Sequence, residues 1–237
     1  QAVGAASLSG CWTSLPLLPL AQQVLLPLAG KDPADFALVA LPVPAKNIQV
    51  SAPVKKLGLR GCPQADLNVQ DVALADSNLI MRGADAARKI ETLWSQAEAC
   101  MMAIRAGIAD ASYSTARDYA AQRYQGGKII IRHSLIRKML ADFYREKCVL
   151  HEQWQNIASG LRPGEKLSAG QMGMALNSGR LVPLLASDGI QLLGGVGYME
   201  DYPQERRFRD AKHCEFLLGH PQARNFSLWN PEAEWLS

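Results

Sequence analysis

The stretch Ile190-Gln-Leu-Leu-Gly-Gly-Val-Gly-Tyr-Met-Glu-Asp-Tyr-Pro-Gln-Glu-Arg-Arg-Phe-Arg-Asp-Ala-Lys212 is the most informative part of this sequence. It joins a glycine turn, Gly194 to Gly197, to a charged segment that Pro203 opens. Glycine carries no Cβ, so its backbone can approach a ligand closely. Proline is favoured in the first turn of a helix. The stretch therefore predicts an accessible turn followed by a helix that ends near Gly219.

A long amphipathic helix is expected upstream of this stretch. After Gly83, apolar residues recur at steps of three and four, which is the spacing of one buried helical face. The pair Gly126-Gly127 ends this helix. The predicted buried stripe consists of Ile90, Leu93, Trp94, Ala97, Met101, Ile104 and Ile108.

Two more helices complete the C-terminal part of the prediction. One runs through Ile136 toward Trp154, and the next starts near Ser168 and is kinked or ended around Pro183. Four helices joined by short turns imply an antiparallel bundle. We therefore expect a helical domain over residues 83–237.

Residues 1–82 have the texture of a small β unit. The apolar run Phe36–Leu41 and the alternation Leu67–Leu74 are typical of strands. The predicted fold class is thus α+β, with a partial β domain followed by a four-helix bundle.

Composition excludes several classes of function. The net charge of +3 in 237 residues comes from interleaved signs, so no basic stripe predicts nucleic-acid binding. Prolines and glutamines interrupt the apolar run Leu15–Leu28, which is too short to span a bilayer. The five cysteines form no CxxC pair and suit a reducing compartment. Cys148 and His151 lie one helical turn apart, but two ligands fall short of a zinc site.

Two separated motifs resemble those of the acyl-CoA dehydrogenases, flavoenzymes that oxidise the α,β carbon bond of acyl thioesters. The stretch 190–212 is similar to the C-terminal signature of the family. The block Tyr119-Ala-Ala-Gln-Arg-Tyr-Gln-Gly-Gly-Lys128, with Ile136 and Leu140-Ala-Asp142 after it, is similar to a second family motif. The segment 56–63 resembles a loop of the family's middle β domain, so residues 1–82 are expected to be part of that domain.

The resemblance implies FAD as the cofactor. In the family, the residues at Arg123, Gln191, Gly194 and Gly195 reach the flavin of the neighbouring subunit, and Gln222 matches a further family glutamine. His220 stands where the family has a flavin-contacting threonine. The residues alone favour a plainer interpretation, in which Arg123 is a helix-end charge and the double glycine a tight turn.

Three further positions depart from the family pattern. Gly126 replaces an aromatic residue that packs on the flavin, Ser134 replaces a glutamine, and Ala175 replaces a lysine. The first change is expected to reshape the flavin contact.

The family's catalytic base is the decisive departure. Counting six residues from Lys212 places Leu218 at the glutamate position, and Ala97 occupies the alternative position in the long helix. Neither side chain can accept a proton. Glu98 is turned by about 100° from Ala97, and Glu215 is expected to be solvated or salt-bridged, so both are minor candidates.

These residues predict a degenerate or partial acyl-CoA dehydrogenase subunit. It would complete the FAD site of a homologous partner in a heteromeric complex that oxidises acyl-CoA to enoyl-CoA, with an electron-transferring flavoprotein as a further partner. From the sequence, we expect no counterpart of the family's N-terminal helical domain or of its Trp-Ile-Thr flavin segment. The alternatives are an active dehydrogenase with an unconventional base, a flavin-dependent monooxygenase relative, and a flavin-free scaffold. The expected location is the cytoplasm, or the mitochondrial matrix in a eukaryote.

Overall fold

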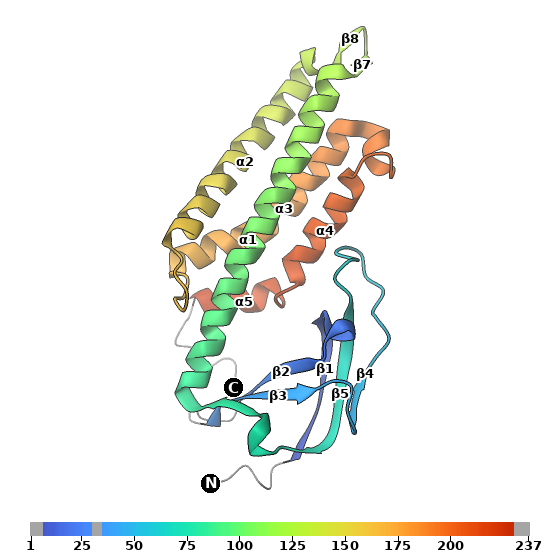
Figure 1. Ribbon diagram of the computed structural model, residues 1–237. Helices are drawn as coiled ribbons and strands as arrows, with labels where there is room; N and C mark the ends of the chain where they lie inside the picture. The colour runs from blue at the N-terminus through green and yellow to red at the C-terminus, as the bar shows by residue number, and fades with distance from the viewer. Residues whose placement is uncertain (1–6, 30–34, 230–237) are drawn as a thin grey trace. The chain divides into compact units, whose positions relative to one another are not determined.

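The computed structural model describes residues 7–29 and 35–229. It divides the chain into two compact units, one within residues 1–93 and one within residues 94–236. Strands dominate the first unit and helices the second (Figure 1). The predicted α+β fold class is confirmed. Strand gives way to helix between Arg82 and Gly83, while a domain boundary at that point stays a prediction.

Two antiparallel three-stranded sheets build the first unit, in the orders β1-β5-β4 and β2-β3-β6. Short 3-10 turns at 18–20 and 76–78 connect some of the strands. The strands are β1 (Ser7–Pro16), β2 (Gln23–Leu28), β3 (Ala37–Pro42), β4 (Ile48–Val50), β5 (Gln64–Ala73) and β6 (Leu79–Arg82).

Both predicted strands are present, as β3 and β5. Leu67 and Val69 of β5 are buried together with Leu26 of β2 and Leu41 of β3, so the two sheets share one hydrophobic core. This follows from the alternation of the sequence, because successive side chains of a strand point to opposite faces.

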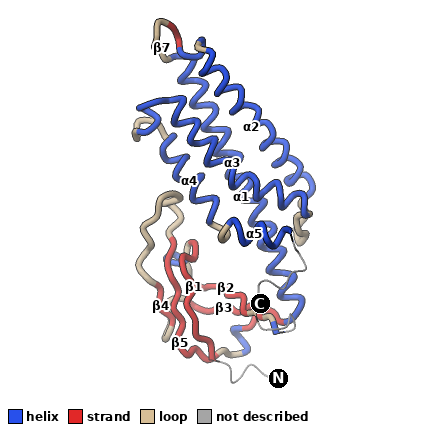
Figure 2. Tube along the Cα trace, turned by 180° about the vertical axis from the view of Figure 1, so that it is seen from behind, coloured by secondary structure: helices blue, strands red, loops and turns tan. Residues whose placement is uncertain are grey.

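Four long helices follow the strands, and they run alongside one another in both views (Figures 1 and 2). The first helix begins within the first unit, and the second unit contains the rest of it and the other three. A short hairpin, β7 (Tyr124–Gln125) and β8 (Lys128–Ile129), joins the first two helices, and a 3-10 turn at 130–132 follows it. The helices are α1 (Gly83–Gln122), α2 (Ser134–Gly160), α3 (Ala169–Leu193) and α4 (Gln204–Phe216), followed by the shorter α5 (Pro221–Trp229).

The start of α3 was correctly located, and of the two possibilities expected at Pro183, a kink or an end, the end is ruled out. Ser168 caps the helix: its Oγ accepts a hydrogen bond from Gln171 N at 3.2 Å, and its own N–H donates to Gln171 Oε1 at 3.0 Å. The helix does not end at Pro183, because it continues to Leu193. Pro183 is buried, and the packing of this helix outweighs the single backbone hydrogen bond that a proline removes.

The predicted buried stripe of α1 is wrong in part. Met101 is buried, but Leu93, Trp94 and Ile104 are 44%, 51% and 46% exposed. The buried line instead carries mainly small and polar residues, and the buried charges among them find partners there. These residues are Ser95, Glu98, Ala99, Met102, Arg105, Ala109, Ser112, Ala116 and Ala120.

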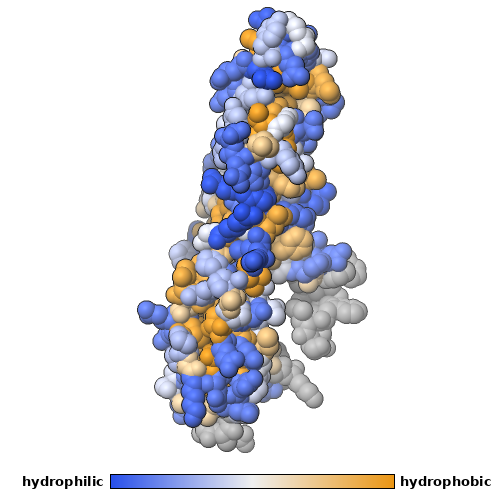
Figure 3. Space-filling view, turned by 90° about the vertical axis from the view of Figure 1, so that its right-hand side faces the viewer, coloured by the Kyte–Doolittle hydropathy of each residue, from blue (hydrophilic) through white to orange (hydrophobic). Residues whose placement is uncertain are grey.

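The surface mixes polar and apolar side chains. On the face drawn in Figure 3, hydrophobic residues are interspersed among hydrophilic ones. Among the described residues, no helix combines the length and the apolarity needed to cross a bilayer.

Candidate functional site

An open pocket of about 350 Å³ lies where α1, the hairpin, α2 and the end of α3 meet. It unites three of the residues that sequence comparison assigned to flavin binding, Arg123, Gln191 and Gly194. These residues are far apart in sequence, and the hairpin after α1 brings them together. The remaining lining residues are Tyr119, Gln125, Gly126, Ile130, His133, Ile136, Leu192 and Leu193.

Arg123 is held by its backbone and leaves its side chain available. Its N–H donates to Tyr119 O at 2.9 Å, and its carbonyl accepts from Ile130 N at 2.8 Å. The exposed guanidinium has no hydrogen bond or ion pair with any residue that the structure describes. Its N–H donors are therefore free to bind an anion such as a phosphate.

The double glycine presents open backbone beside this pocket. Gly194 has φ 64° and ψ −142°, and its N–H donates to Gln191 O. A Cβ added at Gly194 or Gly195 would meet no atom within 4 Å. At Gly197, by contrast, a Cβ would lie 2.7 Å from Leu193 Cβ. Gly197 thus serves the packing of the turn, whereas Gly194 and Gly195 leave room for something outside the chain.

His133 is a pocket residue that the sequence analysis missed. Its Nε2 shares a hydrogen bond with Gln125 O at 3.0 Å. A Cβ on Gly126 would lie 3.2 Å from the imidazole Cε1. Gly126, at the position where the sequence analysis expects a family aromatic residue, is therefore accompanied by an imidazole ring in the same pocket wall. The sequence signal for this pocket residue was a histidine directly before Ser134. The hairpin brings the ring of this histidine next to Gly126.

A second pocket, of about 450 Å³, shares Tyr119 and Arg123 with the first. The rings of Tyr119 and Tyr202 meet edge to face, with centroids 5.8 Å apart. Arg207 Nη1 donates to Thr115 Oγ1 at 2.8 Å and so ties α4 to α1. The other residues that line this second pocket are Thr115, Asp118, Gln122, Tyr202 and Pro203.

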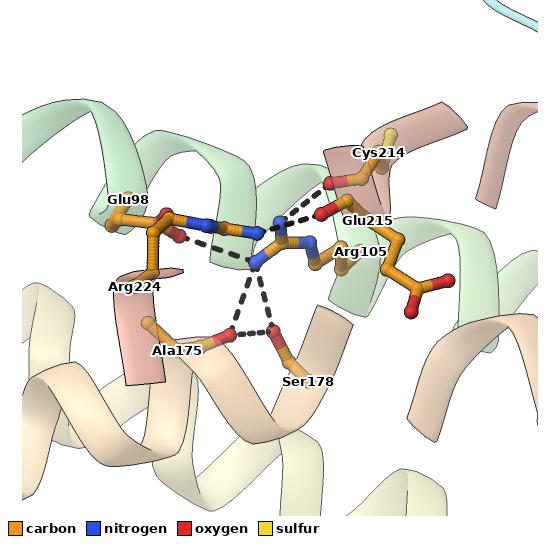
Figure 4. Close-up of polar contacts among 7 residues, drawn as sticks. All are labelled: Glu98, Arg105, Ala175, Ser178, Cys214, Glu215 and Arg224. Atoms are coloured by element: carbon orange, nitrogen blue, oxygen red, sulfur yellow. Dashed lines mark hydrogen bonds and ion pairs between the residues drawn. The ribbon is translucent and has the colours of Figure 1, made fainter. Parts of the chain in front are cut away.

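The two positions at which the sequence analysis expects the family's base, Ala97 and Leu218, carry no proton acceptor. The carboxylate of Glu98, next to Ala97, is engaged in ion pairs. Glu98 is 4% exposed. Its Oε2 lies 3.3 Å from Arg105 Nη1, and its Oε1 accepts a hydrogen bond from Arg224 Nη1. Figure 4 shows both guanidinium groups against this carboxylate. Ala97 is half-buried beside it, and Leu218 is half-buried shortly after α4.

Glu215 is salt-bridged, as expected. Its carboxylate accepts from Lys212 Nζ at 2.5 Å and points away from the Arg105 guanidinium (Figure 4). Its backbone carbonyl accepts from Arg224 Nη2 at 2.6 Å.

Gln222 and His220 lie apart from the residues that line the Arg123 pocket. Both are exposed, and the backbone N–H of Gln222 donates to His220 Nδ1 at 3.3 Å. No group of three or more metal-ligating side chains forms among the described residues.

The family model for the C-terminal domain of acyl-CoA dehydrogenases matches residues 89–223, which is more than half of the chain. The chain belongs to the acyl-CoA dehydrogenase family. Members of this family are FAD-dependent oxidoreductases. The resemblance inferred from the sequence motifs is confirmed.

Curated relatives agree with this assignment. An acyl-CoA dehydrogenase of Bacillus subtilis is 32% identical over 169 residues, covering 70% of this chain and 44% of the relative. Cyclohexane-1-carbonyl-CoA dehydrogenase of Syntrophus aciditrophicus is 28% identical over 171 residues, covering 70% and 44%. The mitochondrial isovaleryl-CoA dehydrogenase of Bos taurus is 27% identical, covering 77% and 43%. The chain spans about half the length of the curated relatives it matches.

Solved structures share the fold. An acyl-CoA dehydrogenase of Geobacillus kaustophilus superposes with a TM-score of 0.86 at 18% identity, covering 95% of this chain and 60% of the other. Butyryl-CoA dehydrogenase of Megasphaera elsdenii gives 0.81 at 21% identity, covering 95% and 60%. A chain described with the electron transferring flavoprotein of Acidaminococcus fermentans gives 0.84 at 19% identity, covering 96% and 61%.

Proposed function

We propose that this chain completes the FAD site of a homologous acyl-CoA dehydrogenase subunit in a heteromeric complex that oxidises acyl-CoA to enoyl-CoA. The observation that carries the proposal is the pocket in which Arg123, Gln191 and Gly194 meet. These residues lie on different elements and converge on one open surface. An electron-transferring flavoprotein is the proposed electron acceptor of the complex.

The residues of this pocket fit the chemistry of FAD. Arg123 offers unpaired directional donors to a diphosphate. Gly194 and Gly195 leave their backbone open to close approach, and Gln191 adds an exposed amide. Gln222, which does not line this pocket, is proposed as a separate FAD contact on α5. FAD held by these residues would supply a hydride acceptor for thioester oxidation.

The chain is proposed to lack the family's catalytic base. Leu218 and Ala97 cannot accept a proton, and both carboxylate oxygens of Glu98 contact guanidinium groups. A carboxylate bound in this way is stabilised as an ion-pair partner rather than presented to a substrate. The dehydrogenation step is therefore assigned to the partner subunit, and this chain contributes to holding the cofactor.

A charge-removal experiment tests the proposal. Arg123→Ala, assembled with the flavin-bearing homologous subunit, is expected to weaken FAD binding roughly 10- to 150-fold, because a hydrogen bond to a charged group is worth about 1.5–3 kcal/mol. Arg180→Ala is the matched control, since Arg180 is an exposed arginine of α3 outside both pockets. Flavin content and affinity are measured by absorbance and fluorescence titration. Equal FAD affinity in the two variants would refute the assignment of Arg123.

A further inference from the structure

The second pocket, of about 450 Å³, is not used by the proposed function. It lies between the end of α1 and the segment that leads into α4. Apart from Tyr119 and Arg123, its lining residues are not those of the pocket assigned to FAD. A pocket of this size is large enough for a small-molecule ligand. The side chains around it therefore indicate which ligand it would take.

Arg207 places a positive charge behind the wall of this pocket. Its side chain is half-buried, and its Nη1 donates to two neutral acceptors, Thr115 Oγ1 at 2.8 Å and Gln204 Oε1 at 3.3 Å. Burial lowers the pKa of Arg207, and the neighbouring Arg206 lowers it further. In the part of the chain that the structure describes, no carboxylate forms an ion pair with this guanidinium. The charge is therefore uncompensated, and an anion nearby would stabilise it.

Contacts with α3 hold Arg207 in this position. Gln204 is fully buried, and its Nε2 donates to Ala186 O at 2.8 Å. A Cβ at Gly189 would collide with this amide, so the absence of a side chain at Gly189 makes room for Gln204. The Oε1 of Gln204 is thereby fixed as an acceptor for Arg207. The guanidinium is thus positioned before any ligand binds, which lowers the cost of binding.

Thr115 presents a hydroxyl donor to the pocket. A threonine hydroxyl can donate one hydrogen bond and accept two. The oxygen of Thr115 accepts from Arg207, and its proton has no acceptor among the described residues. Because Thr115 lines the pocket, this O–H is available to a ligand oxygen, and the bond from Arg207 polarises it.

The balance of charge around the pocket favours an anion. Arg123 lines the pocket, and its guanidinium is unpaired in the described part of the chain. Asp118 also lines it, but the carboxylate of Asp118 is paired with Arg117 Nη2 at 2.7 Å. Two uncompensated guanidinium groups, of Arg123 and Arg207, therefore accompany the hydroxyl of Thr115. Such donors suit the oxygens of a phosphate.

Two tyrosines give the pocket an aromatic wall. Tyr119 and Tyr202 both line it, and their rings meet edge to face with centroids 5.8 Å apart. Both side chains are half-buried, and a planar base can stack on an aromatic ring. The exposed amide of Gln122 in the same lining can donate to and accept from a base or a ribose. Phosphate donors beside an aromatic wall fit a nucleotide.

We propose that the second pocket binds a nucleotide, with a phosphate at Thr115 and Arg123, the charge of Arg207 behind it, and the base against the two tyrosines. The inference does not rest on the proposed function. Arg123 borders both pockets, and a guanidinium has five N–H donors, so it can bind an anion on either side. Thr115 lines the second pocket only, and Arg207 contacts Thr115.

The test is isothermal titration of the full chain with ADP, and with inorganic pyrophosphate and adenosine as the two parts of that ligand. ADP is expected to bind more tightly than pyrophosphate, and adenosine, which has no phosphate, about tenfold more weakly than ADP or weaker still. Free CoA also carries an adenine nucleotide. Tighter binding of ADP than of CoA would indicate a free nucleotide as the ligand, and the reverse would indicate the nucleotide end of a coenzyme.

Three variants locate the phosphate. Thr115→Val keeps the shape of the side chain and removes the donor, so ADP should bind roughly 10- to 150-fold more weakly, whereas Thr115→Ser keeps the hydroxyl and should bind ADP as the wild-type chain does. Arg207→Gln should weaken the binding of ADP and pyrophosphate but not that of adenosine. Arg180→Gln is the charge-matched control, because Arg180 is exposed and lines neither pocket.

The wild-type result does not depend on any variant: a chain that binds no ADP, or that binds adenosine as tightly as ADP, overturns the inference. A Thr115→Val chain that keeps both its helical circular dichroism and the wild-type affinity for ADP also overturns it, as does an Arg180→Gln chain weakened as much as Arg207→Gln. Failure of the proposed function would show separately, because Arg123→Ala would then leave the FAD content of the complex unchanged while Thr115→Val still lost ADP.

Discussion

Removing the carboxylate of Glu98 should destabilise the helical unit strongly. Glu98→Ala leaves the fully buried Arg105 without its counter-ion, beside the mostly buried Arg224. Burial already lowers the pKa of Arg105, Glu98 raises it, and Arg224 lowers it further. Deleting Glu98 removes the main charge that offsets the cost of burial.

The size of the effect follows from the contacts that remain. Breaking a buried ion pair from one side costs about 3–5 kcal/mol. Arg105 keeps the carbonyls of Ala175 and Cys214 at 3.0 and 2.6 Å, and Arg224 keeps that of Glu215, so we expect the lower end, about 3 kcal/mol. For a chain of this size that corresponds to a fall in Tm of roughly 6–12 °C.

The assay is thermal and urea unfolding followed by far-UV circular dichroism. Glu152→Ala is the control, because Glu152 is an exposed glutamate of α2 and such changes usually lie within about 0.5 kcal/mol. The double variant Glu98→Ala/Arg105→Met should lose less free energy of unfolding than the sum of the losses in the two single variants. The reason is that both members of the ion pair are removed together, so neither is left buried without its partner. A Glu98→Ala protein as stable as the Glu152→Ala control would refute the reasoning.

Two further properties follow from the same region. Gly179→Ala should lower the free energy of unfolding by about 1–3 kcal/mol, because the added Cβ meets a guanidinium fixed by several hydrogen bonds. Gly107→Ala, in the middle of α1 where the added Cβ meets nothing, should raise the free energy of unfolding by about 0.5–1 kcal/mol. Urea titration that shows equal effects of the two changes would contradict this. Burial raises the pKa of Cys214 to about 11, so its thiol stays protonated and unreactive at pH 8. The exposed Cys100 should instead be alkylated by iodoacetamide. Peptide mapping that finds Cys214 modified in the folded protein would count against its burial.

The sequence predicted the helices well because their signals are local. A capping residue at Ser168, glycines after α1 and a proline before α4 each mark an end within a few residues. The same signals could not decide between a kink and a helix end at Pro183, because whether a proline ends a helix depends on packing against distant elements. They also gave no indication of α5, which Arg224 fastens to Glu98, a residue 126 positions away.

The candidate site was only partly predictable for a related reason. Motif comparison identified Arg123, Gln191 and Gly194, which the structure unites in one pocket, but it could not show that His133 joins them. Hydrophobic periodicity placed Leu93 and Trp94 inside, because it assumes that buried positions are large and apolar. In α1 they include Glu98 and Arg105, whose burial makes sense only when their mutual contact is known.

The central claim is that this chain completes a homologous subunit's flavin site and does not dehydrogenate thioesters itself. Native mass spectrometry of the purified complex, together with anaerobic titration by acyl-CoA thioesters, tests it most directly. The account predicts a heteromer of this chain with a homologous subunit in which acyl-CoA bleaches the flavin absorbance, and an isolated chain that shows no such bleaching. A homo-oligomer of this chain that carries one FAD per subunit and is bleached rapidly by acyl-CoA would contradict the account.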